Sequence, residues 1–227
     1  MSAKFSGNYW LMWLRWNLYR RYRKPGDRST HYKAAVLRMR KLLRELPPGS
    51  LVVDCGANVG VVSEFFLRQG MKVIAFEPDP VALRAFKARL SGEANLRLEE
   101  KAVGASPGVA PIFQSAALDG AGLQATESSS LIHRDIHGAA PAGEVEVVDL
   151  IAYLKALPEK VRILKLDVEG YEADIVEAML DDGIYRDIDL ILVETHERFS
   201  PELAARLGRI RQRVREQGIG NICLDWH

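Results

Sequence analysis

One feature limits the possible folds of this chain more than any other. It consists of two short apolar segments that are separated by a glycine-containing turn and a helix. LVVDC at 51–55 has the length and composition of a buried strand, VVSEFFLRQ at 61–69 has helical spacing, and KVIAFEP at 72–78 is a second strand. This order predicts a β-α-β unit, in which the two strands lie parallel and the helix crosses one face of the sheet.

The rest of the chain continues this alternation. Asp79 before Pro80 predicts an N-cap with proline at the first helical position, and Ser200 before Pro201 predicts another. Further strands are expected at 95–103, 109–114, 144–150, 161–168, 188–196 and 219–227, and further helices at 31–46, 80–90, about 150–157, 171–180 and from 201. The fold class is therefore α/β, with a doubly wound, mostly parallel sheet.

One long segment interrupts the pattern. Residues 115–143 show no sustained period and are rich in Ala, Gly and Ser. A loop of this length inside a compact domain is usually a functional lid or a disordered segment.

Charge divides the chain into two parts. The 227 residues have a net charge of +1, but residues 1–45 hold 12 of the 31 Lys and Arg and only 2 of the 30 Asp and Glu, which leaves +10 there and −9 in the remainder. We therefore expect a basic, aromatic-rich helical N-terminal extension at 1–46 and one folded α/β domain at 47–227. A domain of that size can bury a sizeable core.

The basic extension contains YWLMWLRWNLYRRYRK at 9–24, followed by a turn-rich linker at 23–30. Three interpretations remain open for 9–24: a helix packed on the domain or on a second copy in a homo-oligomer, contact with a membrane surface, and contact with nucleic acid, which we consider the least favoured.

The cysteines and the hydropathy of the chain indicate the cellular compartment in which the protein is expected. Cys55 and Cys223 lack the spacing of a zinc site or a redox pair, so reduced thiols are expected. No apolar run reaches the roughly 20 residues needed to cross a bilayer, and no signal peptide with a cleavage site is recognisable. We expect a cytoplasmic protein, at most peripheral to a membrane.

The first β-α-β unit has the features of a nucleoside site. Asp54 ends a strand that turns through Gly56 and Gly60 into a helix, and Glu77 closes the next strand. A carboxylate so placed can accept both hydroxyl groups of a ribose. Because the turn lacks the G-x-G-x-x-G spacing of pyrophosphate-binding folds, a nucleoside without a pyrophosphate fits better.

Four motifs, DCGANVG, FEPDP, ILKLDVEGYE and VETH, together resemble the FkbM family of S-adenosylmethionine-dependent methyltransferases over residues 51–196. The resemblance implies a class I methyltransferase (Rossmann-like) fold, S-adenosyl-L-methionine as cofactor, and O-methylation of a hydroxyl on a sugar, a glycolipid or a secondary metabolite. A small-molecule, glycan or lipid-linked acceptor would be the partner.

The resemblance also implies residue roles. Glu77 would bind the ribose, and the methionine part of the cofactor would be lined by Asp54, Gly56, Asn58 and Gly60. Ser129 and Ser130 resemble the serine-bearing loop of the family. Two features depart from the pattern: no acidic residue at 101–106 is placed to meet the adenine amine, and little sequence follows the last predicted strand to form the antiparallel hairpin expected at the sheet edge.

ILKLDVEGYE at 163–172 carries three acids at the end of a buried strand. Asp167 ends the strand, where ligands of doubly wound sheets bind, and it is expected to contact the cofactor. Alternation places Lys165 on the same side as Asp167, so these two can pair. Glu169 falls in the turn, and Glu172 in the first turn of the next helix, where an acid caps favourably.

VETH ends the neighbouring strand and adds two candidates beside Asp167. His196 is the natural general base for a hydroxyl acceptor, with Glu194 as an alternative base or substrate anchor. These two and Asp167 form the predicted catalytic set. With Glu169 they also suffice chemically for a magnesium-type cation, but spacing across two strands cannot show convergence, so no metal is included in the predicted site.

Two other functions remain as alternatives. One is an RNA-directed or noncatalytic S-adenosylmethionine-binding module that uses the basic N-terminal arm. The other is a nicotinamide-dependent oxidoreductase, which Glu77 would tolerate but the missing third glycine disfavours.

Overall fold

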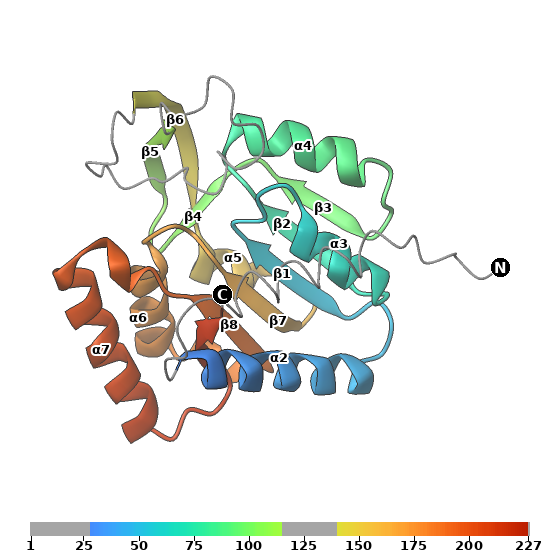
Figure 1. Cartoon of the computed structure of the whole chain (residues 1–227). Helices are drawn as coiled ribbons and strands as arrows, with labels where there is room; N and C mark the ends of the chain where they lie inside the picture. Colours follow the sequence, from blue (N-terminus) through green and yellow to red (C-terminus); the bar gives the residue numbers. More distant parts are fainter. Residues whose placement is uncertain (1–27, 115–139, 227) are drawn as a thin grey trace.

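The structure, a computed structural model, describes residues 28–114 and 140–226. Within these residues, six parallel strands form one sheet in the order β3-β2-β1-β7-β8-β9 (Figure 1). Their bounds are β1 Leu51–Cys55, β2 Lys72–Phe76, β3 Leu96–Glu99, β7 Val161–Leu166, β8 Leu190–Glu194 and β9 Ile222–Trp226. The strand order reverses between β1 and β7, which creates the switch point where doubly wound sheets bind ligands.

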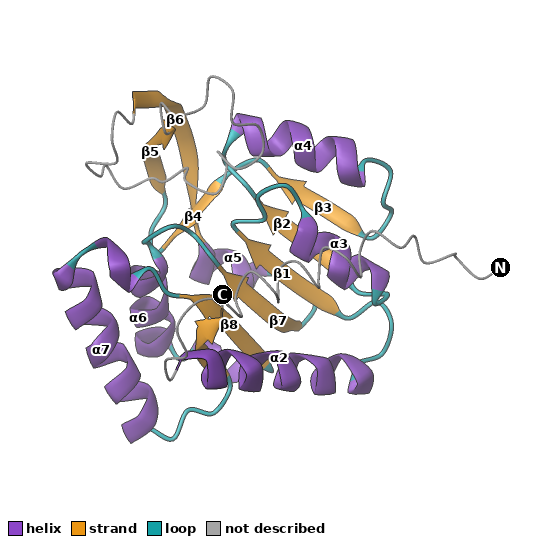
Figure 2. Ribbon diagram, viewed as in Figure 1, coloured by secondary structure: helices purple, strands orange, loops and turns teal. Residues whose placement is uncertain are grey.

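Helices cover both faces of this sheet (Figure 2). One face packs against α2 (Arg28–Glu45), α3 (Val61–Arg68) and α4 (Pro80–Leu90), and the other against α5 (Leu150–Ala156), α6 (Glu172–Asp182) and α7 (Pro201–Glu216). Two short 3-10 helices, η3 (Ile184–Asp187) and η4 (Glu197–Phe199), lie beside β8 in the sequence. The predicted doubly wound α/β class is thus confirmed.

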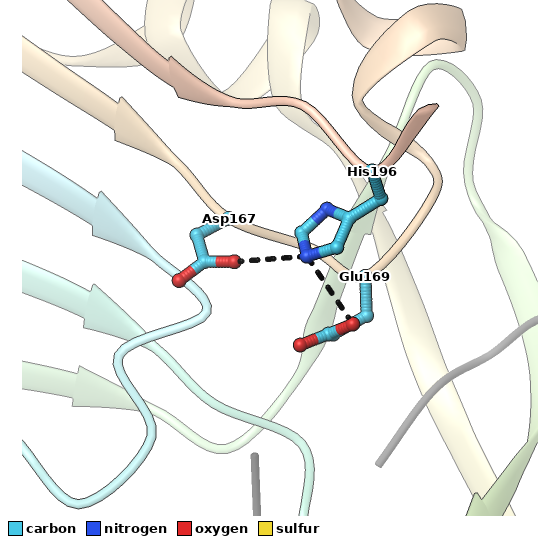
Figure 3. A group of neighbouring side chains, drawn as sticks. All are labelled: Asp167, Glu169 and His196. Carbon is cyan, nitrogen blue, oxygen red and sulfur yellow. Dashed lines mark ion pairs between the residues drawn. The ribbon is translucent and has the colours of Figure 1, made fainter. Parts of the chain in front are cut away.

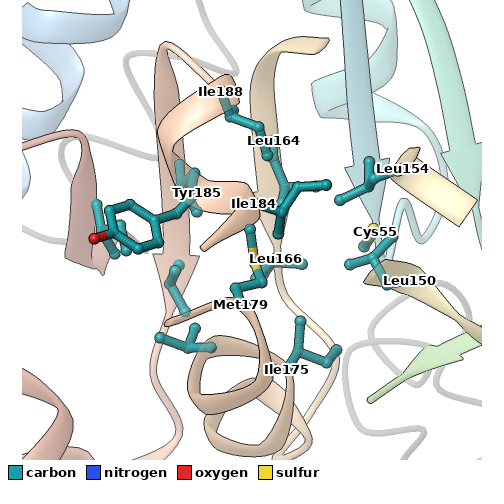
Figure 4. Packing of buried hydrophobic residues seen from close by; sticks show 14 of the residues in the cluster. Cys55, Leu150, Leu154, Leu164, Leu166, Ile175, Met179, Ile184, Tyr185 and Ile188 are labelled. Carbon is teal, nitrogen blue, oxygen red and sulfur yellow. The ribbon is translucent and has the colours of Figure 1, made fainter. Parts of the chain in front are cut away.

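Two apolar clusters follow from the alternation of side chains along each strand. Leu164 and Leu166 of β7 are fully buried against α5 and α6 (Figure 4), whereas Ile163 is fully buried in the cluster on the opposite face. Near-continuous apolar runs such as ILKL are expected for parallel strands buried on both faces. The core therefore holds the carboxyl ends of β1, β7 and β8 rigidly beside one another.

Helix α2 is part of this packing. Its buried Met39 belongs to the same cluster as Leu192 of β8 and Trp226 of β9, and Tyr32 contacts the Trp226 ring at 5.8 Å between centroids. The helices that connect β7, β8 and β9 all run over the other face, so α2 covers the half of the sheet that they leave bare. The predicted linker at 23–30 is wrong in its last three residues, because α2 begins at Arg28.

A second sheet differs most from the sequence-based expectation. The predicted strand at 95–103 is two strands, because after β3 the chain leaves the main sheet and β4 (Ala102–Gly104) pairs with β6. β6 (Ala140–Asp149) also pairs antiparallel with β5 (Gly108–Gln114), so the last four residues of the loop expected at 115–143 belong to a strand instead. Such long-range pairing leaves no periodic signal in an Ala- and Gly-rich stretch.

Several local predictions are confirmed. The Asp79 side chain accepts a hydrogen bond from the Val81 N–H at 2.7 Å, and the Ser200 hydroxyl accepts one from the Leu203 N–H at 3.1 Å. Strand β9 pairs parallel with β8, and the part of the chain that the structure describes has no antiparallel hairpin at this edge of the sheet. Among the helices of the described residues, none has the length and apolar character that a membrane span needs.

Candidate functional site

The turn after β1 is shaped by contact with the end of β7. Gly56 has φ +74°, and a Cβ atom there would lie 1.7 Å from the backbone oxygen of Asp167. The Gly56 and Ala57 N–H groups both donate to the Phe76 carbonyl of β2. Glycine at 56 is therefore required by the crossing of the chain over itself, in addition to any close approach of a cofactor.

Glu77 is held against this turn from the end of β2. Its two carboxylate oxygens accept hydrogen bonds from the backbone N–H groups of Asn58, at 2.7 Å, and Asp79, at 2.8 Å. Burial raises the pKa of Glu77 to about 7, although these bonds act in the opposite direction. The structure thus brings together two residues predicted to bind the cofactor, Asn58 and Glu77.

Asp54 lies beneath the turn and is fully buried. The Ser63 hydroxyl donates to its Oδ2 at 2.7 Å, and the Lys165 ammonium lies 3.2 Å from its Oδ1. Lys165 also donates to the Gly56 carbonyl at 2.7 Å. Asp54 therefore supports the turn after β1 through Ser63 and Lys165. Its predicted contact with the cofactor stays a prediction.

Lys165 links this turn to the acidic motif. Its ammonium lies 3.3 Å from Asp167 Oδ2, which confirms the pairing predicted from alternation. Burial alone would lower the pKa of Lys165, but the negative charges of Asp54 and Asp167 raise it above its ordinary value. The lysine is thus a permanent buried cation between two carboxylates.

Asp167, Glu169 and His196 converge at the carboxyl ends of β7 and β8 (Figure 3). His196 Nε2 lies 3.3 Å from Glu169 Oε2 and 3.8 Å from Asp167 Oδ1. Glu169 has φ +52°, in the left-handed region, and this conformation turns the chain sharply from β7 towards α6. The predicted proximity of His196 to Asp167 is confirmed.

Glu172 contacts the Nδ1 atom of His196 and so fixes the orientation of the imidazole. It is fully buried, its Oε1 lies 2.8 Å from His196 Nδ1 and accepts the Val168 N–H, and its Oε2 accepts the Gly170 N–H. We expected a simple cap at the start of α6, and the side chain instead folds back to close the turn. Sequence spacing could not reveal this, because an acid in a first helical turn usually points to solvent.

The pKa values of Glu169 and His196 are both raised, for different reasons. Burial raises the pKa of Glu169 to about 7, although the charge of His196 opposes that shift. Burial would lower the pKa of His196, but the hydrogen bond and charge of Glu172, with Glu169 and Asp167, raise it.

The remaining predicted residues are placed as follows. His196 is 1% exposed, whereas the side chains of Asp167 and Glu169 beside it are partly exposed. Glu194 ends β8, is half-buried and raises the pKa of Lys165 through its charge. Ser129 and Ser130, like the basic segment 9–24, lie outside the described residues. Cys55 and Cys223 are free thiols.

Comparisons with known proteins show the family to which the chain belongs. The sequence model of the methyltransferase FkbM domain matches residues 54–219. The chain is 23% identical over 208 residues to the methyltransferase sdnD of Sordaria araneosa, covering 75% of this chain and 80% of that protein.

Solved structures give more distant matches. An rRNA methylase from Streptococcus thermophilus is 19% identical, with 78% of each chain covered and a TM-score of 0.40. A TehB-like SAM-dependent methyltransferase from Corynebacterium glutamicum is 11% identical, with 80% of this chain and 83% of that one covered and a TM-score of 0.35.

Proposed function

The chain belongs to the FkbM methyltransferase family and is a methyltransferase, and from this premise we propose that it methylates a hydroxyl group with S-adenosylmethionine as donor. The observation that carries the proposal is the adjacency of two different groups at the switch point of the sheet. The glycine turn and Glu77 form one group, Asp167, Glu169 and His196 form the other, and Lys165 joins them.

The residues of the first group fit S-adenosylmethionine. Each Glu77 oxygen already accepts one backbone N–H, and a carboxylate has about four acceptor positions, so two remain for the ribose hydroxyls. The N-cap of α3 is Gly60, which has no side chain to bond the first N–H groups of that helix. When bound, the cofactor supplies a methyl carbon attached to a positively charged sulfur.

The second group fits a hydroxyl acceptor. Methyl transfer to oxygen needs an in-line approach and a destination for the acceptor proton. Asp167 and Glu169 are about one quarter exposed, at 26% and 23% of their side chains, whereas His196 is buried behind them. We assign acceptor positioning and removal of its proton to this group as a unit, with Glu194 at its border.

Cofactor binding is the first test. Isothermal titration with S-adenosylmethionine should show one site per chain, and Glu77→Ala should weaken binding at least about tenfold through the lost ribose contacts. Glu100→Ala is the matched control, because Glu100 is exposed and pairs with Lys87 on the surface. Absence of binding, or equal binding by the Glu77→Ala and wild-type proteins, would refute the proposal.

The atom methylated is the second test. The protein, incubated with methyl-labelled S-adenosylmethionine and hydroxyl acceptors of the sugar, glycolipid and secondary-metabolite classes, should transfer label to a base-stable ether. Label found only in esters, on nitrogen or in RNA would contradict O-methylation of a hydroxyl and favour a different acceptor class.

A further inference from the structure

We propose that Asp167, Glu169 and His196 bind a divalent cation of the Mn²⁺ type beside the methyl-transfer site. One oxygen or nitrogen atom from each of the three side chains lies within 4.8 Å of the other two. The three come from two neighbouring strand ends, and all face one another in Figure 3. Binding of the ion stands on these contacts alone, whereas its role in catalysis rests on the proposed function.

The separations suit one ion. An octahedral cation with bonds of about 2.1 Å holds adjacent ligand atoms about 3.0 Å apart. The imidazole Nε2 is 3.3 Å from Glu169 Oε2 and 3.8 Å from Asp167 Oδ1. Small rotations of two partly exposed carboxylates would bring all three atoms to bonding distance, and the buried imidazole need not move.

The imidazole is already oriented as a metal ligand would be. The Glu172 carboxylate accepts the hydrogen on Nδ1, so Nε2 faces Asp167 and Glu169, and binding of a cation at Nε2 would release the proton that the neighbouring carboxylates favour there. Glu172 is fixed by two backbone N–H groups, those of Val168 and Gly170. A histidine held by a buried carboxylate at its second nitrogen is the usual outer arrangement of metal-ligating histidines.

Charge favours the same conclusion. Asp167, Glu169 and Glu172 surround one imidazole, and the first two are only partly exposed to water. Lys165 neutralises Asp167 through Oδ2, whereas Oδ1, the oxygen nearer His196, faces the cluster. Arg198 and the His196 proton already offset part of the charge of Glu169, and a dication placed among the three ligands would replace that proton and compensate the remaining negative charge.

The ligand set also limits the metal. One imidazole nitrogen with two carboxylate oxygens suits Mn²⁺, Fe²⁺, Co²⁺ or Zn²⁺ better than Mg²⁺ or Ca²⁺, which prefer oxygen alone. Three protein ligands leave coordination positions open on the exposed side. There the ion would hold the acceptor hydroxyl and lower its pKa, so that its proton passes to solvent past the carboxylates of the group. The oxygen would then bond to the methyl carbon as the carbon–sulfur bond of the sulfonium breaks and S-adenosylhomocysteine leaves.

Metal binding can be measured without cofactor or acceptor. Full-length protein stripped with EDTA is titrated with Mn²⁺ and followed by electron paramagnetic resonance, with one bound ion per chain and an imidazole nitrogen coupling expected. Glu169→Gln and Asp167→Asn should weaken Mn²⁺ binding more than tenfold. Glu172→Gln should weaken it about 10- to 100-fold through misorientation of the imidazole.

Asp174→Asn provides the matched control. Asp174 lies on α6 two positions after Glu172, but its side chain is 42% exposed and pairs with Arg206, so its removal should leave Mn²⁺ affinity unchanged. Thermal unfolding separates loss of the site from loss of the fold: Mn²⁺ should raise the melting temperature of the wild-type and Asp174→Asn proteins but not that of Glu169→Gln.

The outcomes distinguish the two proposals. Absence of Mn²⁺ binding, binding without nitrogen coupling, or equal affinity in the wild-type and Glu169→Gln proteins would overturn the metal site. A protein that binds Mn²⁺ at this site but fails to bind S-adenosylmethionine would keep the metal site and overturn the proposed function.

Discussion

Lys165 is a buried cation between Asp54 and Asp167, and its replacement tests what stabilises the site. Lys165→Met should lower the free energy of unfolding by about 3–5 kcal/mol, because the fully buried Asp54 and the partly exposed Asp167 would both lose the positive charge that compensates them. Urea unfolding measures this. Lys160→Met is the control, since the Lys160 side chain is 51% exposed in its pair with Asp189, and such surface pairs contribute about 1 kcal/mol or less. Equal losses in the two variants would show that the buried pair is not structural.

The pKa of Glu77 predicts how cofactor affinity depends on pH. Burial raises this pKa from 4.5 to about 7, so the carboxylate is largely protonated at pH 6 and largely ionised at pH 8. Because the ionised form accepts both ribose hydroxyls, S-adenosylmethionine affinity should rise about tenfold over that range. Titration calorimetry at several pH values checks it, and Glu77→Gln, whatever its affinity, should lose this dependence. A flat wild-type profile would contradict the prediction.

The same shift has a consequence for stability. A carboxyl group whose pKa is higher in the folded state than in the unfolded state stabilises the fold fully below about pH 4.5 and loses that contribution as the pH rises through about 7. Glu77 thus costs stability under the conditions in which it would bind ribose. A carboxylate in a salt bridge has a lowered pKa, so its contribution to stability changes with pH in the opposite direction.

At the scale of elements, α2 is predicted to be part of the folding unit. Met39 is 5% exposed and packs on the sheet, whereas Leu37 on the same helix is 64% exposed. Met39→Ala should destabilise the protein by about 2–5 kcal/mol through lost burial and a residual cavity. Leu37→Ala should change stability by no more than about 0.5 kcal/mol. Thermal or urea unfolding compares the two, and a dispensable α2 would show no difference.

Elements with a strong local signal were predictable from sequence. The apolar runs of β1, β7 and β8 and the caps at Asp79 and Ser200 are written in adjacent residues. The split after β3 and the pairing of β6 with β5 were not, because both depend on contacts between segments far apart in the chain. Pairing across such a distance is decided by tertiary packing, which outweighs local propensity.

The position of the candidate site was predictable from sequence, but the contacts between its side chains were not. The rule that parallel strands end at one edge placed Asp167 and His196 together. It could not show that Glu172 turns back to His196, since the left-handed backbone at Glu169 changes the direction of every side chain after it. Nor did alternation indicate that Lys165 would reach both Asp54 and the Gly56 carbonyl.

At the scale of the whole molecule, charge predicts contact with an anionic surface. The exposed residues Lys33, Arg40, Lys41 and Arg44 recur along one side of α2, directly after the strongly basic N-terminal segment. We expect the protein to sediment with vesicles of phosphatidylglycerol and phosphatidylcholine, and to be released by salt. Each basic residue near such a surface contributes about 1 kcal/mol.

Charge reversal tests this surface. The triple variant Arg40→Glu, Lys41→Glu, Arg44→Glu should reduce vesicle binding more than tenfold. Reversal of two exposed arginines on α7, Arg209→Glu with Arg215→Glu, is the control and should have little effect. If wild-type protein ignores anionic vesicles but binds RNA with steep salt dependence, the membrane interpretation is wrong and the nucleic-acid alternative gains support.

The position of β1 at the centre of the sheet has a consequence for biosynthesis. β2 follows β1 closely in the chain, but the lysine of β7 that bonds the Cys55 carbonyl comes 110 positions later. At about 5–20 residues per second, a ribosome takes roughly 5–20 s to supply that second partner. During this interval the nascent chain presents an apolar strand edge that can pair with other chains. β1, the strand that leads into the turn at Gly56, is therefore the segment for which chaperone protection during translation matters most.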